Sequence, residues 1–154
     1  MHRRRGLAAL VVSAISMALV LSLAGGAATA KKRKVVKLTA NMSGQQEVPP
    51  QPEGTGKAKF KMKKKKGKVC YDVRFEGIGD ATVAHIHTGE KGVSGPPLIT
   101  LFEDTAFPSP QEACVKAPKS DIKAIIKRPK KYYVNVHTSE HPAGAIRGQL
   151  KKKK

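Results

Sequence analysis

Four histidines in the second half of the chain have the spacing of metal ligands. His85 and His87 are two residues apart in the segment 84–88, which alternates apolar and polar residues as a β-strand does. Side chains two apart on a strand leave from the same face, with Cα atoms about 6.5–7 Å apart, so both imidazoles can reach one ion. His137 lies in a second strand-like segment, and His141 follows it in a turn. Three neutral imidazoles around an open position form a catalytic zinc site or a copper site.

A purely structural role explains the same histidines. In the segment 133–138, two valines alternate with Tyr133, Asn135 and His137, which therefore share one face of a strand. A row of Asn, His and Thr beside the histidine pair suits a half-buried layer, because each buried polar atom needs a hydrogen-bond partner. Arg147 can complete such a layer by donating to several carbonyl groups or by pairing with Glu47. The sequence leaves both interpretations open, a structural polar layer and a metal site.

Short alternating segments separated by Gly and Pro must position these side chains. This pattern predicts an all-β fold, a Greek-key sandwich or barrel of roughly 6–8 antiparallel strands. One short helix is predicted near 120–127, where Ser120 is the N-cap residue and Pro129 follows the last turn. Strands are predicted at 36–40, 57–63, 69–76, 81–88, 98–102, 132–138 and 145–150.

The first thirty residues have the layout of a secretory signal peptide. Three arginines precede an uncharged run from Leu7 to Leu23, and the small-residue triplet Ala28-Thr29-Ala30 follows. This order predicts export and cleavage after Ala30. An uncleaved membrane anchor is the alternative, because the apolar run is nearly long enough to span a bilayer. The arginines also suggest the twin-arginine route, but its flanking Ser and Phe are missing, so general secretion is expected.

The rest of the chain, 31–154, is strongly basic and fits one domain, which we expect to be a monomer. Removing the three leader arginines from the net charge of +19 leaves +16. Such a charge attracts polyanions, and export favours anionic wall polymers, acidic polysaccharides or lipid headgroups over intracellular DNA and RNA. Lysine runs at 31–37 and 151–154 are predicted to be solvated tails on either side of a domain at 38–150.

The chain has two cysteines, Cys70 and Cys114, both beyond the predicted leader. In an oxidising compartment they most simply form one disulfide, which contributes about 4 kcal/mol of stability in the chain-entropy model. A metal-thiolate pair is the alternative, but no CxxC spacing supports it. Cys70 alternates with the buried face of its strand, so the predicted bridge ties that strand to a loop outside the main core.

Three segments, taken in their order and spacing, are more specific than composition. The first is GQQEVPP at 44–50, which contains Glu47 and Pro49. The second is AHIHTG at 84–89, followed by Gly92 and Gly95-Pro96. The third is YVNVHT at 133–138 with Asn135, followed by Pro142, Gly144 and IRGQL at 146–150 with Arg147. Together they resemble the CHRD domain, a module first described in chordin and widespread in bacterial exported proteins, from about residue 38 to residue 150.

The resemblance implies a binding or structural module at the cell envelope or outside the cell. Chordin is an extracellular antagonist of growth factors, which by analogy suggests a protein ligand, and single-bridge bacterial members have cysteines placed like Cys70 and Cys114. The family is also remotely similar to the copper/zinc superoxide dismutase barrel, although the bridging histidine and the zinc ligands of that enzyme are not recognisable here. The chain carries no HExxH, GxSxG, Walker A or GxGxxG motif, so we expect a non-enzymatic protein. Copper or zinc bound by His85, His87 and His137 is the alternative function.

Overall fold

The computed structural model describes residues 35–153, except for the side chains of residues 104 and 105. The predicted leader at 1–30 and its cleavage position lie outside these residues. Within the described part, none of the helices has the length and apolar character needed to cross a membrane. The elements are β1 (Val36–Ser43), η1 (Gly44–Gln46), β2 (Thr55–Lys63), η2 (Lys64–Lys66), β3 (Lys68–Glu76), β4 (Ala81–Thr88), β5 (Pro97–Phe107), β6 (Gln111–Lys116), α1 (Lys119–Lys127), η3 (Pro129–Lys131), β7 (Tyr132–His137), β8 (Ile146–Gln149) and β9 (Lys151–Lys152).

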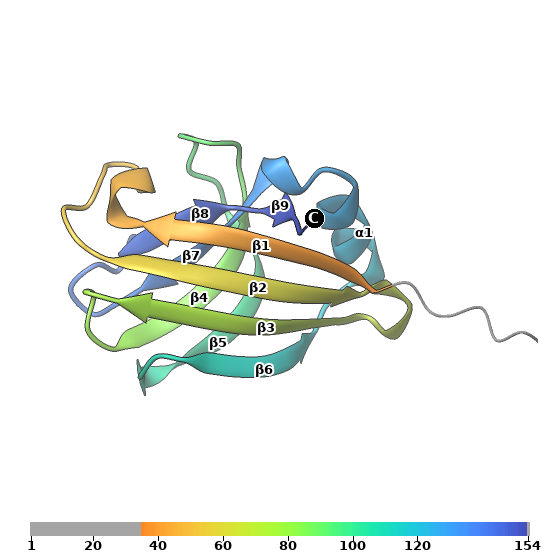
Figure 1. Ribbon diagram of the computed structural model, residues 1–154, viewed down its shortest axis with the longest axis horizontal. Coiled ribbons are helices and arrows are strands. Elements are labelled where there is room, and N and C mark those ends of the chain that lie inside the picture. Colours follow the sequence, from red (N-terminus) through yellow and green to blue (C-terminus); the bar gives the residue numbers. More distant parts are fainter. Residues whose placement is uncertain (1–34, 154) are drawn as a thin grey trace, which may run out of the picture. The chain divides into compact units, whose positions relative to one another are not determined.

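The strands form one antiparallel sheet that curls into a nearly closed barrel (Figure 1). The hydrogen-bonded order is β5-β4-β7-β8-β1-β2-β3-β6, with β9 added to β1. β5 and β6, at the two ends of this order, lie beside each other. The short helix α1 packs at one end of the barrel, where Ile122 and Ile125 join the core. The predicted all-β fold with one short helix is confirmed.

Strict alternation explains why these segments form strands around one core. In β2, Ala58, Phe60 and Met62 are buried and the intervening lysines are exposed. Its partner β3 buries Val69, Tyr71, Val73 and Phe75, as its sequence pattern predicts. Each buried aliphatic or aromatic side chain of this size contributes about 1.5–3 kcal/mol of transfer free energy, so this paired hairpin supplies a large part of the barrel wall.

The disulfide prediction is confirmed in its pairing but wrong in its setting. Cys70 and Cys114 are bonded, but Cys114 lies in strand β6 and stands directly opposite Cys70 in the β3–β6 register. The bridge therefore joins two strands instead of a strand and a loop. It does lie outside the main core cluster, on the outer face of β3. The sequence predicted no strand at 111–116, because β6 presents mostly exposed side chains.

β1 begins at Val36, the first residue of the strand predicted at 36–40. Two other predicted boundaries need correction. Lys151 and Lys152 form β9 and pair with Thr39 and Leu38, so the predicted C-terminal tail is sheet at its start. The helix begins at Lys119 with Pro118 as its N-cap residue, which places Ser120 in the first turn, where its hydroxyl donates to Asp121 at 3.0 Å. With β6 and β9 included, the described strands exceed the six to eight expected.

Candidate metal centre

Two neighbouring strands position the three histidines. β4 carries His85 and His87, and β7 pairs with it so that His137 stands opposite Val83 and Asn135 opposite His85. In β4 the alternate residues Ala84 and Ile86 are buried in the core. The three imidazoles consequently project from the outer face of the barrel wall, where loops cover them.

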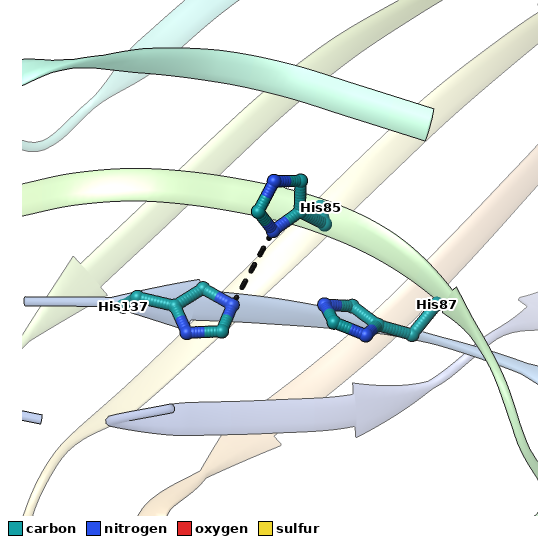
Figure 2. A group of neighbouring side chains, drawn as sticks. All are labelled: His85, His87 and His137. Carbon is teal, nitrogen blue, oxygen red and sulfur yellow. Dashed lines mark hydrogen bonds between the residues drawn. The ribbon is translucent and has the colours of Figure 1, made fainter. Parts of the chain in front are cut away.

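The imidazoles converge on one point (Figure 2). One ring nitrogen from each of His85, His87 and His137 lies within 4.8 Å of the other two. The closest pair, His85 Nδ1 and His137 Nε2, is 3.4 Å apart. Zinc–nitrogen bonds of about 2.0–2.1 Å in a tetrahedral site place two ligand nitrogens about 3.3–3.4 Å apart. This pair already has that spacing, and the third nitrogen lies within 4.8 Å of both.

Backbone carbonyl groups orient two of the rings. His87 Nδ1 lies 2.9 Å from the Gly95 carbonyl oxygen, and His137 Nδ1 lies 3.0 Å from that of Pro142. A carbonyl only accepts, so each Nδ1 carries the proton and each Nε2 presents a lone pair. Metal-ligating histidines are held in this way, with the second ring nitrogen donating to a carbonyl or carboxylate. His85 Nδ1 donates to His137 Nε2, so His85 has to change tautomer, with its proton on Nε2, for its Nδ1 to bind an ion.

One atom of the cluster bears directly on the metal-site interpretation of the histidines. His87 Nε2 is buried and has no hydrogen-bond partner among the residues that the structure describes. Leaving this lone pair unsatisfied costs about 1–3 kcal/mol. A bound cation would satisfy it directly. The donor set therefore fits a metal ion such as copper or zinc.

Burial keeps the three imidazoles neutral at neutral pH. Desolvation lowers the pKa of His137 to about 4, although its hydrogen bond to Pro142 opposes the change. Desolvation also lowers the pKa of His87 and of His85, and the Glu103 carboxylate partly counteracts this at His85. A neutral imidazole is the form that binds metal, so no proton has to be removed from these rings before an ion enters.

A stack of three side chains supports His87 on the side away from the cluster. The Tyr133 ring stacks on His87 at a centroid distance of 4.9 Å and an interplanar angle of 15°. Arg147 lies over the face of the Tyr133 ring that is turned away from His87, with its Cζ atom 3.6 Å from the Tyr133 centroid. This cation–π contact lets Arg147 stay buried, at 2% exposure, although no carboxylate of the described part of the chain lies at ion-pair distance. The stack fixes the plane of the His87 ring.

Arg147 and Gln149 hold the loop 89–96 over the site. Arg147 Nη2 donates to the Val93 carbonyl oxygen at 2.9 Å, and Gln149 Nε2 donates to that of Gly89 at 2.7 Å. Gly95 must be glycine, because a Cβ atom there would lie 2.0 Å from the Thr88 carbonyl oxygen. This loop in turn supplies the carbonyl group that orients His87. Of the two sequence-based expectations for Arg147, donation to carbonyl groups is the one that the structure shows.

Glu47 lies at the other side of this polar layer, next to Asn135. Both residues are buried, and within residues 35–153 Glu47 Oε1 and Asn135 Oδ1 have no hydrogen-bond partner. Gly144, with a φ of +138°, leaves the necessary room, since a Cβ atom there would lie 2.6 Å from Asn135 Nδ2. Burial raises the pKa of Glu47 to about 7, and Arg147, the Val48 amide and Asn135 oppose this.

Glutamine in place of Glu47 will stabilise the protein at high pH. The free energy of unfolding of the wild type falls as the pH rises from 4.5, the ordinary carboxyl value, to about 7, because the folded state holds the proton more tightly. The total fall is about 3 kcal/mol. Glu47→Gln should therefore match the wild type at pH 4 and exceed it by that amount at pH 8 in urea titrations. The buried histidines contribute equally to both proteins, so a difference that does not change with pH would contradict this assignment.

The structure brings most of the predicted site residues together. His85, His87 and His137 form the cluster, and Glu47, Asn135 and Arg147 lie in the layer around it. Pro49 is exposed and His141 is outside the cluster, so neither forms part of it. Sequence reasoning assigned no role to Tyr133 or to the carbonyl groups of Gly95 and Pro142. The glycines and prolines beside the histidine segments were the sequence signal that could have indicated these groups.

Comparison with protein-family models identifies the family to which the chain belongs. The CHRD domain model matches residues 38–150. The chain belongs to the CHRD domain family. No curated protein and no solved structure gives a significant match. The CHRD match spans every residue of the histidine cluster and of its surrounding polar layer.

Proposed function

We propose that this CHRD protein is exported and binds one copper or zinc ion through His85 Nδ1, His87 Nε2 and His137 Nε2. The observation that carries the proposal is the buried, unpartnered Nε2 lone pair of His87 beside two other imidazole nitrogens. His85 is the one partly exposed member of the cluster, which leaves a side for ion entry. The role is that of a binding protein rather than an enzyme. The disulfide and the signal-like leader support export.

Calorimetry on the disulfide-bonded protein, stripped with a chelator, tests this function. We expect one ion per chain for both Cu²⁺ and Zn²⁺, with tighter binding of Cu²⁺ as the Irving–Williams order requires. Elemental analysis after dialysis should give the same stoichiometry. Binding that stays unchanged in the double variant His85→Ala plus His87→Ala, or the absence of stoichiometric binding, would refute the proposal.

A second function, adhesion to anionic surfaces of the cell envelope, is supported by the charge of +16 on residues 31–154, which follows from the sequence. Binding of this kind weakens steeply with ionic strength, because the exposed charges are screened. Sedimentation with an acidic polysaccharide or with anionic vesicles at 20 mM and 500 mM salt tests it. Binding that is insensitive to salt, or undetectable at the lower concentration, would exclude this function.

A further inference from the structure

Basic residues are concentrated at one end of the barrel. Figure 1 shows η2, α1 and β9 at the same end; η2 and η3 both lie beside α1, and β9 lies beside η3. We call these four elements and their flanking residues the basic end. Its members are Lys63, Lys64, Lys65, Lys66, Lys68, Lys116, Lys119, Lys123, Lys127, Arg128, Lys130, Lys131, Lys151, Lys152 and Lys153.

Acidic residues are concentrated elsewhere. Of the eleven acids in the chain, Asp121 is the one that these elements carry among the residues that the structure describes. Within the basic end, the charge of Lys131 is compensated by an ion pair of 2.9 Å with Glu90. In contrast, Lys59 and Arg74 on the barrel wall are paired with Asp72. The basic end therefore carries a large local excess of positive charge, whereas the wall is partly compensated.

The basic end also has an apolar hollow. A cavity of about 500 Å³ is lined by Val35, Val36 and Ile126 together with the lysines at 63–66. Val35 is 42% exposed, and it is one of the few large apolar side chains with such exposure. Lysine side chains keep their charged groups in water while their aliphatic stems cover apolar surface. The hollow is thus apolar at its floor and positively charged at its rim.

We propose that the basic end docks on an anionic lipid bilayer, with its lysines at the headgroup phosphates and Val35 and Ile126 against the acyl boundary. The docking rests on the second proposed function, adhesion to anionic surfaces, and specifies the partner. Lysines contribute to such binding through the negative surface potential, and apolar area adds to it at the interface. A linear polysaccharide offers charge to the rim but nothing apolar to the hollow. The apolar floor is what favours a lipid surface.

Matched lysine variants locate the surface. The double variant Lys64→Gln plus Lys65→Gln lowers the charge of the basic end, and Lys57→Gln plus Lys59→Gln makes the same change on β2. We expect the first to bind vesicles of phosphatidylglycerol and phosphatidylcholine about 25-fold more weakly, from about fivefold per lysine near the surface. The second should change binding less than threefold. Equal losses in both variants would overturn the basic end as the docking surface while leaving adhesion to anions intact.

A tryptophan probe tests contact with the lipid, because the chain has no tryptophan of its own. Val35→Trp places the indole at the hollow, and Val93→Trp places it at a somewhat more exposed site in the loop 89–96, where Val93 is 53% exposed. With brominated vesicles we expect quenching of the first and not of the second. Quenching of neither, together with salt-sensitive binding to dextran sulfate, would overturn lipid docking and keep adhesion to polyanions. Failure to bind vesicles and dextran sulfate at low salt would overturn both.

Discussion

Glutamine at position 137 will weaken Cu²⁺ binding by more than about 100-fold, since even outer-shell partners of metal ligands are worth 10–100-fold in affinity. His137 supplies the nitrogen 3.4 Å from His85 Nδ1, and its ring is fixed by the Pro142 carbonyl group. The variant retains the imidazoles of His85 and His87, which are not the pair whose nitrogens lie 3.4 Å apart. Competition calorimetry against a chelator of known affinity measures the change, and His87→Gln should act similarly.

His141→Gln is the matched control for this loss. His141 is four residues away in sequence but outside the cluster, so this variant should keep the wild-type affinity within twofold. Metal-dependent stability gives a second readout, because an ion at 100 times its dissociation constant raises the free energy of unfolding by about 2.7 kcal/mol. This increase should occur in the wild type and in His141→Gln and be absent in His137→Gln. Equal losses of affinity at positions 137 and 141 would show that the cluster is not the binding site.

The histidine pair was predictable because strand geometry is local. Residues two apart share a face, which placed His85 and His87 together without knowledge of the fold. The addition of His137 depends on β4 pairing with β7 in one register. A shift of one residue would move His137 to the opposite face, and nothing in the local sequence sets the pairing between segments so far apart.

Other parts of the site consist of backbone groups, which no residue type in the sequence indicates. The groups that orient His87 and His137 are the carbonyl oxygens of Gly95 and Pro142, which any residue possesses. The Arg147 side chain reached carbonyl groups rather than Glu47, because the loop 89–96 folds over its guanidinium group. Loop conformation of this kind follows from contacts with the finished barrel. The sequence therefore predicted the candidate ligands but not which ring nitrogen of each histidine carries the proton.

The two strands that sequence analysis missed lack the hydrophobic pattern that defines the others. β6 exposes most of its side chains and is held by its pairing with β3 and by the disulfide. β9 is two lysines, and its backbone continues the sheet through pairing with β1 and a bond of 3.0 Å from Lys153 N to Lys37 O. Backbone hydrogen bonding extends the sheet here without any burial of side chains. Strands of this type can be recognised only from their partners.

Removing the bridge with Cys70→Ala plus Cys114→Ala will lower the free energy of unfolding by about 4 kcal/mol, because the bond reduces the conformational entropy of the unfolded chain. β6 is an edge strand with little buried surface, so its amides should also lose protection from hydrogen exchange before the rest of the barrel does. Urea titration and exchange mass spectrometry measure the two effects. Glu112→Gln, which breaks the ion pair with Arg74 across the same strands, should change stability little, because both groups are exposed.

The cysteine variant also separates the bridge from the metal centre. The disulfide joins β3 and β6, whereas the histidines lie on β4 and β7 in the other half of the strand order. Copper stoichiometry and affinity should consequently match the wild type in the absence of urea, where we expect the variant to remain folded. A protein that keeps its stability but loses copper would instead assign the cysteines as thiolate ligands, and the imidazole cluster would then be a structural layer with one unsatisfied nitrogen.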